Sequence, residues 1–359
     1  MSALTRFTNG IPPLTILATF ALGGAGGLLA AWLGLPLAML LGSMTAVTLA
    51  SALGLRIGGH ALAVPQKWRY VLVPIVGTAI GASFPPDFAS QARHWWLTMA
   101  ALLVFIPTAH ALGYLLFGRL GGLNRPTAYF AAMPGGFIES LDMGEKAGAD
   151  MPMLIMLQLL RLILCIVLIP IAFSLIEGHA VGSASGLAAG AGHAALTAWD
   201  AAVLTLIAVS GWFIASRLNF PAAVLSGPLL MSGLAHALGL TAAVPPGWMV
   251  LVTQWVMGTS LGVRLTGFTR GEAGLALRLS LAHIGLMLGI ALGIALLASG
   301  PVGEPVSAVV LAFAPGGVTE MSLVALSLHL SAVYVTLHHL ARIVLAVLVA
   351  RIGQRWVGL

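Results

Sequence analysis

Charged side chains are scarce in this sequence, and so is cysteine. Only 7% of the 359 residues are Asp, Glu, Lys or Arg, whereas about 25% are charged in soluble globular proteins, so this chain could not cover a water-facing surface. The single cysteine, Cys165, lies within an apolar run and excludes a disulfide framework or a thiolate metal cluster. No cleavable signal peptide is expected, because the first apolar run, 14–32, leads directly into further apolar segments.

Apolar residues make up most of the sequence. They make up 59% of the chain, and the mean hydropathy is +1.04. Runs such as 97–116, 153–173 and 281–298 approach the ~20 residues that a helix needs to cross a hydrocarbon core. Lipid offers no partner to an unpaired backbone group, so these runs predict an all-α integral membrane protein. The 16 basic residues against 10 acidic ones are therefore a topology signal rather than a nucleic-acid-binding surface.

The sequence contains two copies of one unit. Met133-Pro-Gly-Gly-Phe-Ile-Glu139 returns as Ala314-Pro-Gly-Gly-Val-Thr-Glu320, 181 positions later. Other landmarks recur in the same order: Arg161 with Arg342 and Gly77-Thr78 with Gly258-Thr259 at 181 positions, Val64-Pro65 with Val244-Pro245 at 180, and Gly34-Leu-Pro36 with Asn219-Phe-Pro221. We interpret 1–177 as the first membrane repeat, the Gly/Ser/Ala-rich segment 178–195 as a linker, and 196–359 as the second repeat.

Each copy is predicted to contain five membrane-spanning helices and one broken element. Proline-Gly-Gly lies at the centre of each broken element, where a helix cannot easily continue. The expected spans are 13–32, 36–55, 68–84, 95–118 and 151–176 in the first copy, and 196–216, 221–240, 247–265, 275–299 and 331–351 in the second, with broken elements at 126–149 and 305–330.

The paired Pro-Gly-Gly-x-x-Glu motifs, each followed by an apolar helix with one Arg, are similar to motifs of a known family. The chain resembles, over nearly its whole length, the AbrB-type duplicated bacterial membrane protein family, which differs from the small soluble DNA-binding proteins that share the name. Members of that family carry labels as regulators or as ammonia monooxygenases. The resemblance therefore implies a bacterial membrane protein and leaves its activity open.

Basic residues predict how the broken elements lie in the membrane. Cytoplasmic loops are enriched in Lys and Arg. With Arg6 inside, a re-entrant hairpin at each break keeps the basic loops of both copies inside, whereas a crossing element exposes Arg264 and Arg278 to the exterior. We favour the hairpin. Five spans per copy then make the two repeats inverted, with both termini on the cytoplasmic side of the inner membrane.

The breaks are the predicted solute site. Freed backbone groups and half-helix starts near mid-membrane form the substrate site of many inverted-repeat transporters. At ~1.5 Å rise per residue, Glu139 and Arg161 lie at one depth, as do Glu320 and Arg342, so two ion pairs are expected. The candidate solute-binding residues are Pro134, Gly135, Gly136, Glu139, Gln158, Arg161, Pro315, Gly316, Gly317, Glu320, His339, Arg342, Thr78 and Thr259.

Simpler interpretations stand beside these roles. The breaks could be buried kinks, the Glu–Arg pairs could be structural clamps, and Thr78 and Thr259 are better explained by a small-residue packing face. His339 replaces Gln158 in the second copy, so one half could bind solute while the other titrates, although a buried His is more often a satisfied polar group.

Three classes of function compete. Inverted repeats and buried charges favour a secondary transporter for an anionic or zwitterionic solute, with the solute and the lipid bilayer as partners. A membrane monooxygenase would need clustered metal ligands, yet adjacent His338 and His339 point to different helix faces, so no metal and no cofactor are expected. An indirect membrane-bound regulator remains an alternative. Direct nucleic-acid binding is not expected, since no soluble domain is present, and homo-oligomer formation stays open.

Overall fold

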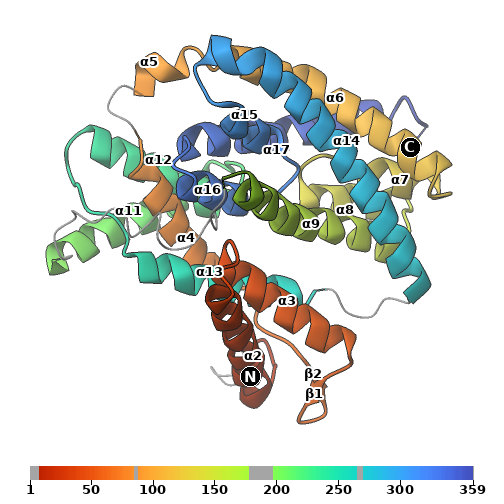
Figure 1. The fold of residues 1–359 in the computed structure, drawn as a ribbon, viewed down its shortest axis with the longest axis horizontal. Coiled ribbons are helices and arrows are strands. Elements are labelled where there is room, and N and C mark those ends of the chain that lie inside the picture. Colours follow the sequence, from red (N-terminus) through yellow and green to blue (C-terminus); the bar gives the residue numbers. More distant parts are fainter. Residues whose placement is uncertain (1–7, 85–87, 178–196, 265–269, 359) are drawn as a thin grey trace. The chain divides into compact units, whose positions relative to one another are not determined.

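The computed structural model of this chain describes residues 8–84, 88–177, 197–264 and 270–358 (Figure 1). The predicted linker 178–195 and Arg6 lie outside these residues. The described helices are α2 (Pro13–Trp32), α3 (Ala38–Ala52), α4 (Trp68–Gly81), α5 (Phe88–Ala92), α6 (Trp96–Arg119), α7 (Arg125–Ala131), α8 (Phe137–Lys146), α9 (Met151–Glu177), α11 (Ala198–Arg217), α12 (Ala223–Ala237), α13 (Gly247–Gly262), α14 (Arg270–Val302), α15 (Val306–Phe313), α16 (Val318–Ser327) and α17 (Ala332–Gly353). The all-α prediction is confirmed, and all ten expected spans are helices.

One small piece of β structure escaped the sequence analysis. Strands β1 (Arg56–Ile57) and β2 (His60–Ala61) pair antiparallel in what we expected to be a plain basic loop. Gly58 and Gly59 join them, and both have positive φ, 58° and 80°. Two consecutive positive φ values are what a tight hairpin turn requires and what glycine adopts without steric cost.

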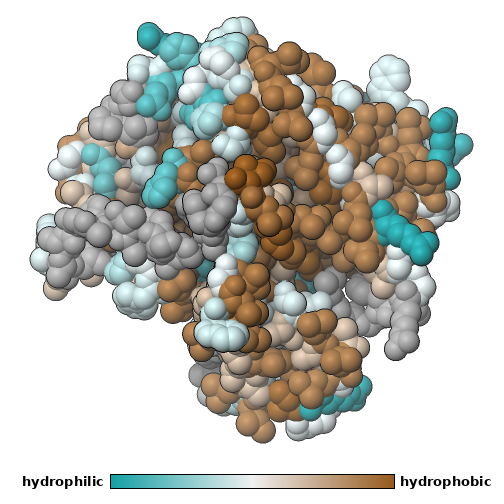
Figure 2. All heavy atoms as spheres, in the orientation of Figure 1, coloured by the Kyte–Doolittle hydropathy of each residue, from teal (hydrophilic) through white to brown (hydrophobic). Residues whose placement is uncertain are grey.

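Six of the described helices are long and apolar enough to cross a membrane. They are α2, α6, α9, α11, α14 and α17, by length and composition. The other expected spans, α3, α4, α12 and α13, have only 14 to 16 residues and reach about 21–24 Å. Figure 2 shows hydrophobic side chains over much of the surface of α14 and α2, and Leu297 on α14 is 81% exposed. Exposed leucines on long apolar helices are typical of a protein that crosses the membrane several times.

The described helices form two compact units, and each unit draws on both sequence copies. The first unit contains α2, α3, α4 and α11, α12, α13, together with α9 from Val167 onward. The second unit contains α5 to α8, α9 up to Ile166, α14, α15, most of α16, and α17. Each unit is therefore built from matching helices of the two copies.

Glycines let the helices of the first unit approach closely. A Cβ on Gly26 of α2 would meet the Gly42 carbonyl of α3, and a Cβ on Gly211 of α11 would meet the Gly227 carbonyl of α12. Gly227 lies 185 positions after Gly42, and Gly211 lies 185 after Gly26. The same backbone-to-backbone crossing therefore occurs in both copies, as is typical of small residues at membrane helix interfaces.

A second pair of crossings ties the copies to each other within that unit. Gly77 of α4 packs on the Leu225 carbonyl of α12, and Gly258 of α13 packs on the Leu40 carbonyl of α3. One turn later Gly81 and Gly262 repeat these contacts with Leu229 and Met44. Any side chain at these glycines would push the helix backbones apart.

Candidate functional site

The first break interrupts the chain where the sequence predicts. Helix α7 ends at Ala131 and α8 begins at Phe137, with Pro134-Gly135-Gly136 between them. Gly136 has φ +71° and precedes the first turn of α8. Glycine adopts this left-handed backbone conformation without steric cost, which explains why the second residue of the Gly-Gly pair is glycine. The predicted start of the half-helix at Phe137 is confirmed.

Two side chains of α9 satisfy the carbonyls that the break leaves open. Gln158 Nε2 donates to the carbonyls of Phe130 at 2.8 Å and Ala131 at 3.3 Å. Arg161 Nη1 donates to the Met133 carbonyl at 3.0 Å. The last carbonyls of a helix have no partner within it, so these buried side chains close the end of α7.

The second break uses the same contacts 181 positions later. Helix α15 ends at Phe313 and α16 begins at Val318, as predicted. His339 Nε2 binds the Leu311 carbonyl at 2.9 Å. Arg342 donates from Nη1 to the Ala314 carbonyl and from Nη2 to the Gly316 carbonyl, the latter at 2.7 Å. His339 and Arg342 thus do for α15 what Gln158 and Arg161 do for α7.

A direct bond between His339 and Arg342 defines the state of the imidazole. Arg342 Nη2 lies 3.0 Å from His339 Nδ1, and a guanidinium only donates, so Nδ1 must accept. The Leu311 carbonyl only accepts, so Nε2 carries the proton. This geometry holds His339 in its neutral form, which argues against the titrating role considered for it.

The glutamates after the breaks lie in the first turns of α8 and α16, and the arginines bind other groups. Glu139 and Glu320 are the third residues of α8 and α16, and each carboxylate folds back over the preceding glycine, Gly136 or Gly317. A Glu at this position can accept from the open amides of the first turn. Arg161 and Arg342 contact backbone carbonyls instead, so the predicted Glu139–Arg161 and Glu320–Arg342 ion pairs are wrong. Equal depth along two helices does not make two side chains face each other.

Comparison with known proteins adds the family. A family model described as "Transition state regulatory protein AbrB" matches residues 48–358, most of the chain and both breaks. The chain belongs to the AbrB family. It is also similar to the "Uncharacterized protein YhjN" of Bacillus subtilis (strain 168), with 23% identity over 344 residues that cover 91% of this chain and 89% of that protein. The resemblance drawn from the paired motifs is confirmed.

Helix α17 of this AbrB-family protein touches both breaks at one residue. A Cβ on Gly135 of the first break would lie 3.5 Å from the Arg342 carbonyl and 3.5 Å from Ala346. The guanidinium of the same Arg342 binds Gly316 of the second break. The backbone of one residue thus supports the first Pro-Gly-Gly while its side chain holds the second.

Three buried ionisable groups gather beside the breaks. Arg161 and Arg342 are 3% and 2% exposed and lie within electrostatic range of each other. Cys165, one turn after Arg161, is fully buried and within electrostatic range of both. The Nε atoms of both arginines and Oε1 of Gln158 are buried without a hydrogen-bond partner in the described part of the chain. The sequence analysis missed Cys165 as a neighbour of this group, although its spacing of four residues from Arg161 was the available signal.

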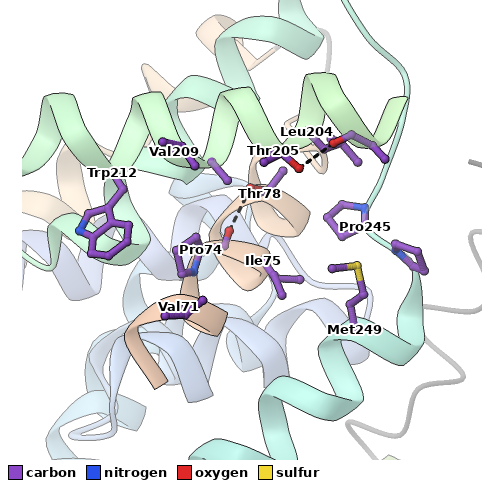
Figure 3. A pocket seen from close by; sticks show the side chains of 13 residues that line it. Val71, Pro74, Ile75, Thr78, Leu204, Thr205, Val209, Trp212, Pro245 and Met249 are labelled. Carbon is purple, nitrogen blue, oxygen red and sulfur yellow. Dashed lines mark hydrogen bonds between the residues drawn. The ribbon is translucent and has the colours of Figure 1, made fainter. Parts of the chain in front are cut away.

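The remaining two predicted site residues lie in the first unit. Thr78 Oγ1 donates to the Pro74 carbonyl at 2.9 Å, and Thr259 packs its side chain against Gly23. Thr78 also lines a cavity of about 330 Å³ among α4, α11 and the start of α13 (Figure 3). The other labelled lining residues are Val71, Pro74, Ile75, Leu204, Thr205, Val209, Trp212, Pro245 and Met249. Because this cavity is almost wholly apolar, Thr78 fits the packing role better than a polar solute contact, and the contact of Thr259 with Gly23 is likewise a packing contact.

Proposed function

We propose that this AbrB-family protein moves a small anionic solute across the bilayer, with the paired breaks as its binding site. One observation carries the proposal. Arg161 and Arg342 are both buried, lie near each other, and bind only neutral partners among the described residues. The proposal thus places two positive charges of the same unit where a carboxylate or phosphate group could neutralise them.

The cost of burying these charges supports a ligand. Taking a charged group out of water without a counter-charge costs several kcal/mol, about as much as a whole side chain gains on burial. Charged residues within membrane helices are rare and usually mark a solute or ion path. Carbonyl contacts offset part of this cost but leave the net charge in place. An anion would offset the rest, and the guanidinium fork suits carboxylate or phosphate oxygens.

The helix starts point to the same class of solute. Helices α8 and α16 begin at the breaks, and the N-terminus of a helix carries about half a positive charge. Such half-helix starts bind anionic groups in transporters with inverted repeats. We therefore keep two inverted repeats with re-entrant breaks, and a bacterial inner membrane location with both termini cytoplasmic, as parts of this proposal.

Solute-dependent stabilisation tests the proposal. Purified protein in detergent is heated with sodium salts of small carboxylates, phosphate and sulfate, and with polyols and alkylammonium chlorides for comparison. A ligand that binds only the folded state raises the melting temperature. We expect some anions, and no cation or neutral compound, to raise it by about 2–5 °C at saturating concentration.

Matched variants locate the effect. Arg161→Lys and Arg342→Lys keep the charge and lose the planar fork, so each should weaken the stabilisation at least tenfold in apparent affinity. Arg119→Lys, on the exposed end of α6, serves as the control and should leave it unchanged. The proposal is wrong if no anion stabilises the protein, if neutral or cationic compounds stabilise it equally, or if the Arg119 variant matches the other two.

A further inference from the structure

A second buried polar group lies in the same unit, on the side of α17 that holds His338. It consists of Trp95, Thr98, Glu304, Tyr334 and His338, all at most 9% exposed. They come from the start of α6, the loop between α14 and α15, and the first turns of α17. None of these residues contacts the break carbonyls, so the anion site does not account for them.

Close contacts join the members of this cluster. The Glu304 carboxylate interacts with the Trp95 indole N–H and lies within electrostatic range of Tyr334. The Tyr334 ring packs between Trp95 and His338, with centroid distances of 5.1 Å and 4.1 Å. The buried Tyr334 hydroxyl has no hydrogen-bond partner within 3.5 Å in the described residues. His338 Nε2 lies 3.0 Å from Thr98 Oγ1. The cluster thus extends from a loop to the residue that precedes His339.

The other copy shows that the fold does not require these polar groups. Positions 181 residues away hold Ala276, Leu279, Leu123, Met153 and Leu157 in place of Trp95, Thr98, Glu304, Tyr334 and His338. These five counterparts pack together in one apolar cluster around Phe117 and Phe130. The same arrangement is therefore stable with hydrocarbon alone. Burying polar groups in its place costs free energy, and a function would explain why they are there.

The hydrogen bonds of His338 are satisfied within the cluster. Its Nδ1 donates to the Tyr334 carbonyl at 2.8 Å. Its Nε2 then accepts from the Thr98 hydroxyl at 3.0 Å, so both ring nitrogens are used by the neutral imidazole. Glu304 therefore remains as the acidic group of the cluster.

We infer that Glu304 is the proton-binding group of this cluster, and that its protonation is coupled to solute movement at the breaks. A proton from water binds the Glu304 carboxylate, which becomes a neutral carboxyl group for as long as the proton is bound. Protonation removes one negative charge from the unit that holds Arg161 and Arg342, so the net positive charge available to an anion rises by one. The coupling rests on the proposed function, but the protonation does not.

The surroundings of Glu304 and His338 support this role for Glu304. Glu304 faces Trp95 from α6 and Tyr334 from α17, while His338 faces Thr98 from α6, Phe313 from α15 and Tyr334 from its own helix. Burial raises the pKa of Glu304 to about 7, although the Trp95 hydrogen bond opposes the rise. A carboxyl group with this pKa gains and loses its proton near neutral pH.

Infrared difference spectroscopy on the purified protein tests proton binding without any solute. As the pH falls from 9 to 5, the carbonyl band of a protonated carboxylic acid should appear with a midpoint near pH 7. Glu304→Gln should lack this component, and Glu145→Gln, an exposed carboxyl of α8, should keep it. The proton-binding role of Glu304 is wrong if the component titrates with an ordinary carboxyl midpoint or survives in Glu304→Gln.

Coupling is tested with inorganic phosphate and acetate as the anion probes. The apparent affinity for acetate, which stays ionised throughout this range, should rise at least threefold between pH 8 and pH 6 in the natural protein. Glu304→Gln should remove that dependence, and Glu145→Gln should keep it. If stabilisation occurs but Glu304→Gln keeps its pH dependence, the coupling is overturned and the anion site stands. If the infrared component titrates but no anion stabilises, the proposed function is overturned and the proton-binding site stands.

Discussion

The two copies of the break solve one structural problem with different side chains. In the first copy Gln158 binds carbonyls in the last turn of α7, and Arg161 binds the Met133 carbonyl just after it. In the second, His339 binds the Leu311 carbonyl in the last turn of α15, and Arg342 binds the carbonyls of Ala314 and Gly316 just after it. Closing a helix end therefore needs only donors at these positions. The hydrogen bond between His339 and Arg342 has no equivalent in the first copy, so closing the helix end does not require it.

The comparison extends to the glutamates and to the buried surroundings. Glu139 is exposed, whereas Glu320 is 8% exposed. An apolar cluster surrounds Leu157 of the first copy, whereas a polar one surrounds His338 of the second. On our proposal, the first copy is the simpler support, and the second holds the groups that respond to charge. Three sets of variants sharpen or break this comparison.

The largest difference is expected between Arg342→Ala and Arg161→Ala. Removing Arg342 leaves the Ala314 and Gly316 carbonyls without their donor and His339 Nδ1 without its partner, whereas removing Arg161 leaves one carbonyl. Hydrogen bonds to charged groups contribute about 1.5–3 kcal/mol each, so Arg342→Ala, with three such contacts against one, should lower stability by roughly three times as much. Unfolding by denaturant in mild detergent measures both. Equal losses of stability in the two variants would show that the two arginines contribute equally to folding.

The glycine crossings of the first unit should behave alike in the two copies. Gly77→Val and Gly258→Val each force a side chain onto a backbone carbonyl, so each should cost about 1–3 kcal/mol. Gly289→Val on α14 meets no atom within 4 Å and serves as the control, with a change below about 0.5 kcal/mol. Melting temperatures of the three variants decide this. A large difference between Gly77→Val and Gly258→Val would mean that the asymmetry is not confined to the second unit.

The smallest effect is expected at Glu139. It is exposed at the first turn of α8, where a carboxylate gains about 0.3–1 kcal/mol from the helix dipole, so Glu139→Gln should cost no more than that. Glu320→Gln alters a buried group, and the loss should be about 1–3 kcal/mol. The same unfolding assay compares them. A larger loss at Glu139 would contradict the view that the second copy holds the charge-sensitive groups.

Linear sequence was sufficient for the helices and the breaks. A Pro-Gly-Gly motif interrupts a helix, so each half-helix was predicted to begin just after the motif. The half-helices begin at Phe137 and Val318, as predicted. The ion-pair prediction failed because it used rise along the helices and ignored the direction of each side chain around its axis. Glu304 was overlooked because its neighbours Trp95, Thr98 and Tyr334 lie far from it in sequence and only packing brings them together.

Composition and repeats were enough to predict an apolar, all-helical chain with two similar halves. Hydropathy and residue spacing are local properties, so they can be taken directly from the linear sequence. Only the tertiary structure decided that each compact unit mixes matching helices of both halves, and that Arg161 and Arg342 bind carbonyls instead of carboxylates. Which donor meets which acceptor depends on angles between packed helices. Those angles are set by packing between helices that are distant in the sequence, and no single segment encodes them.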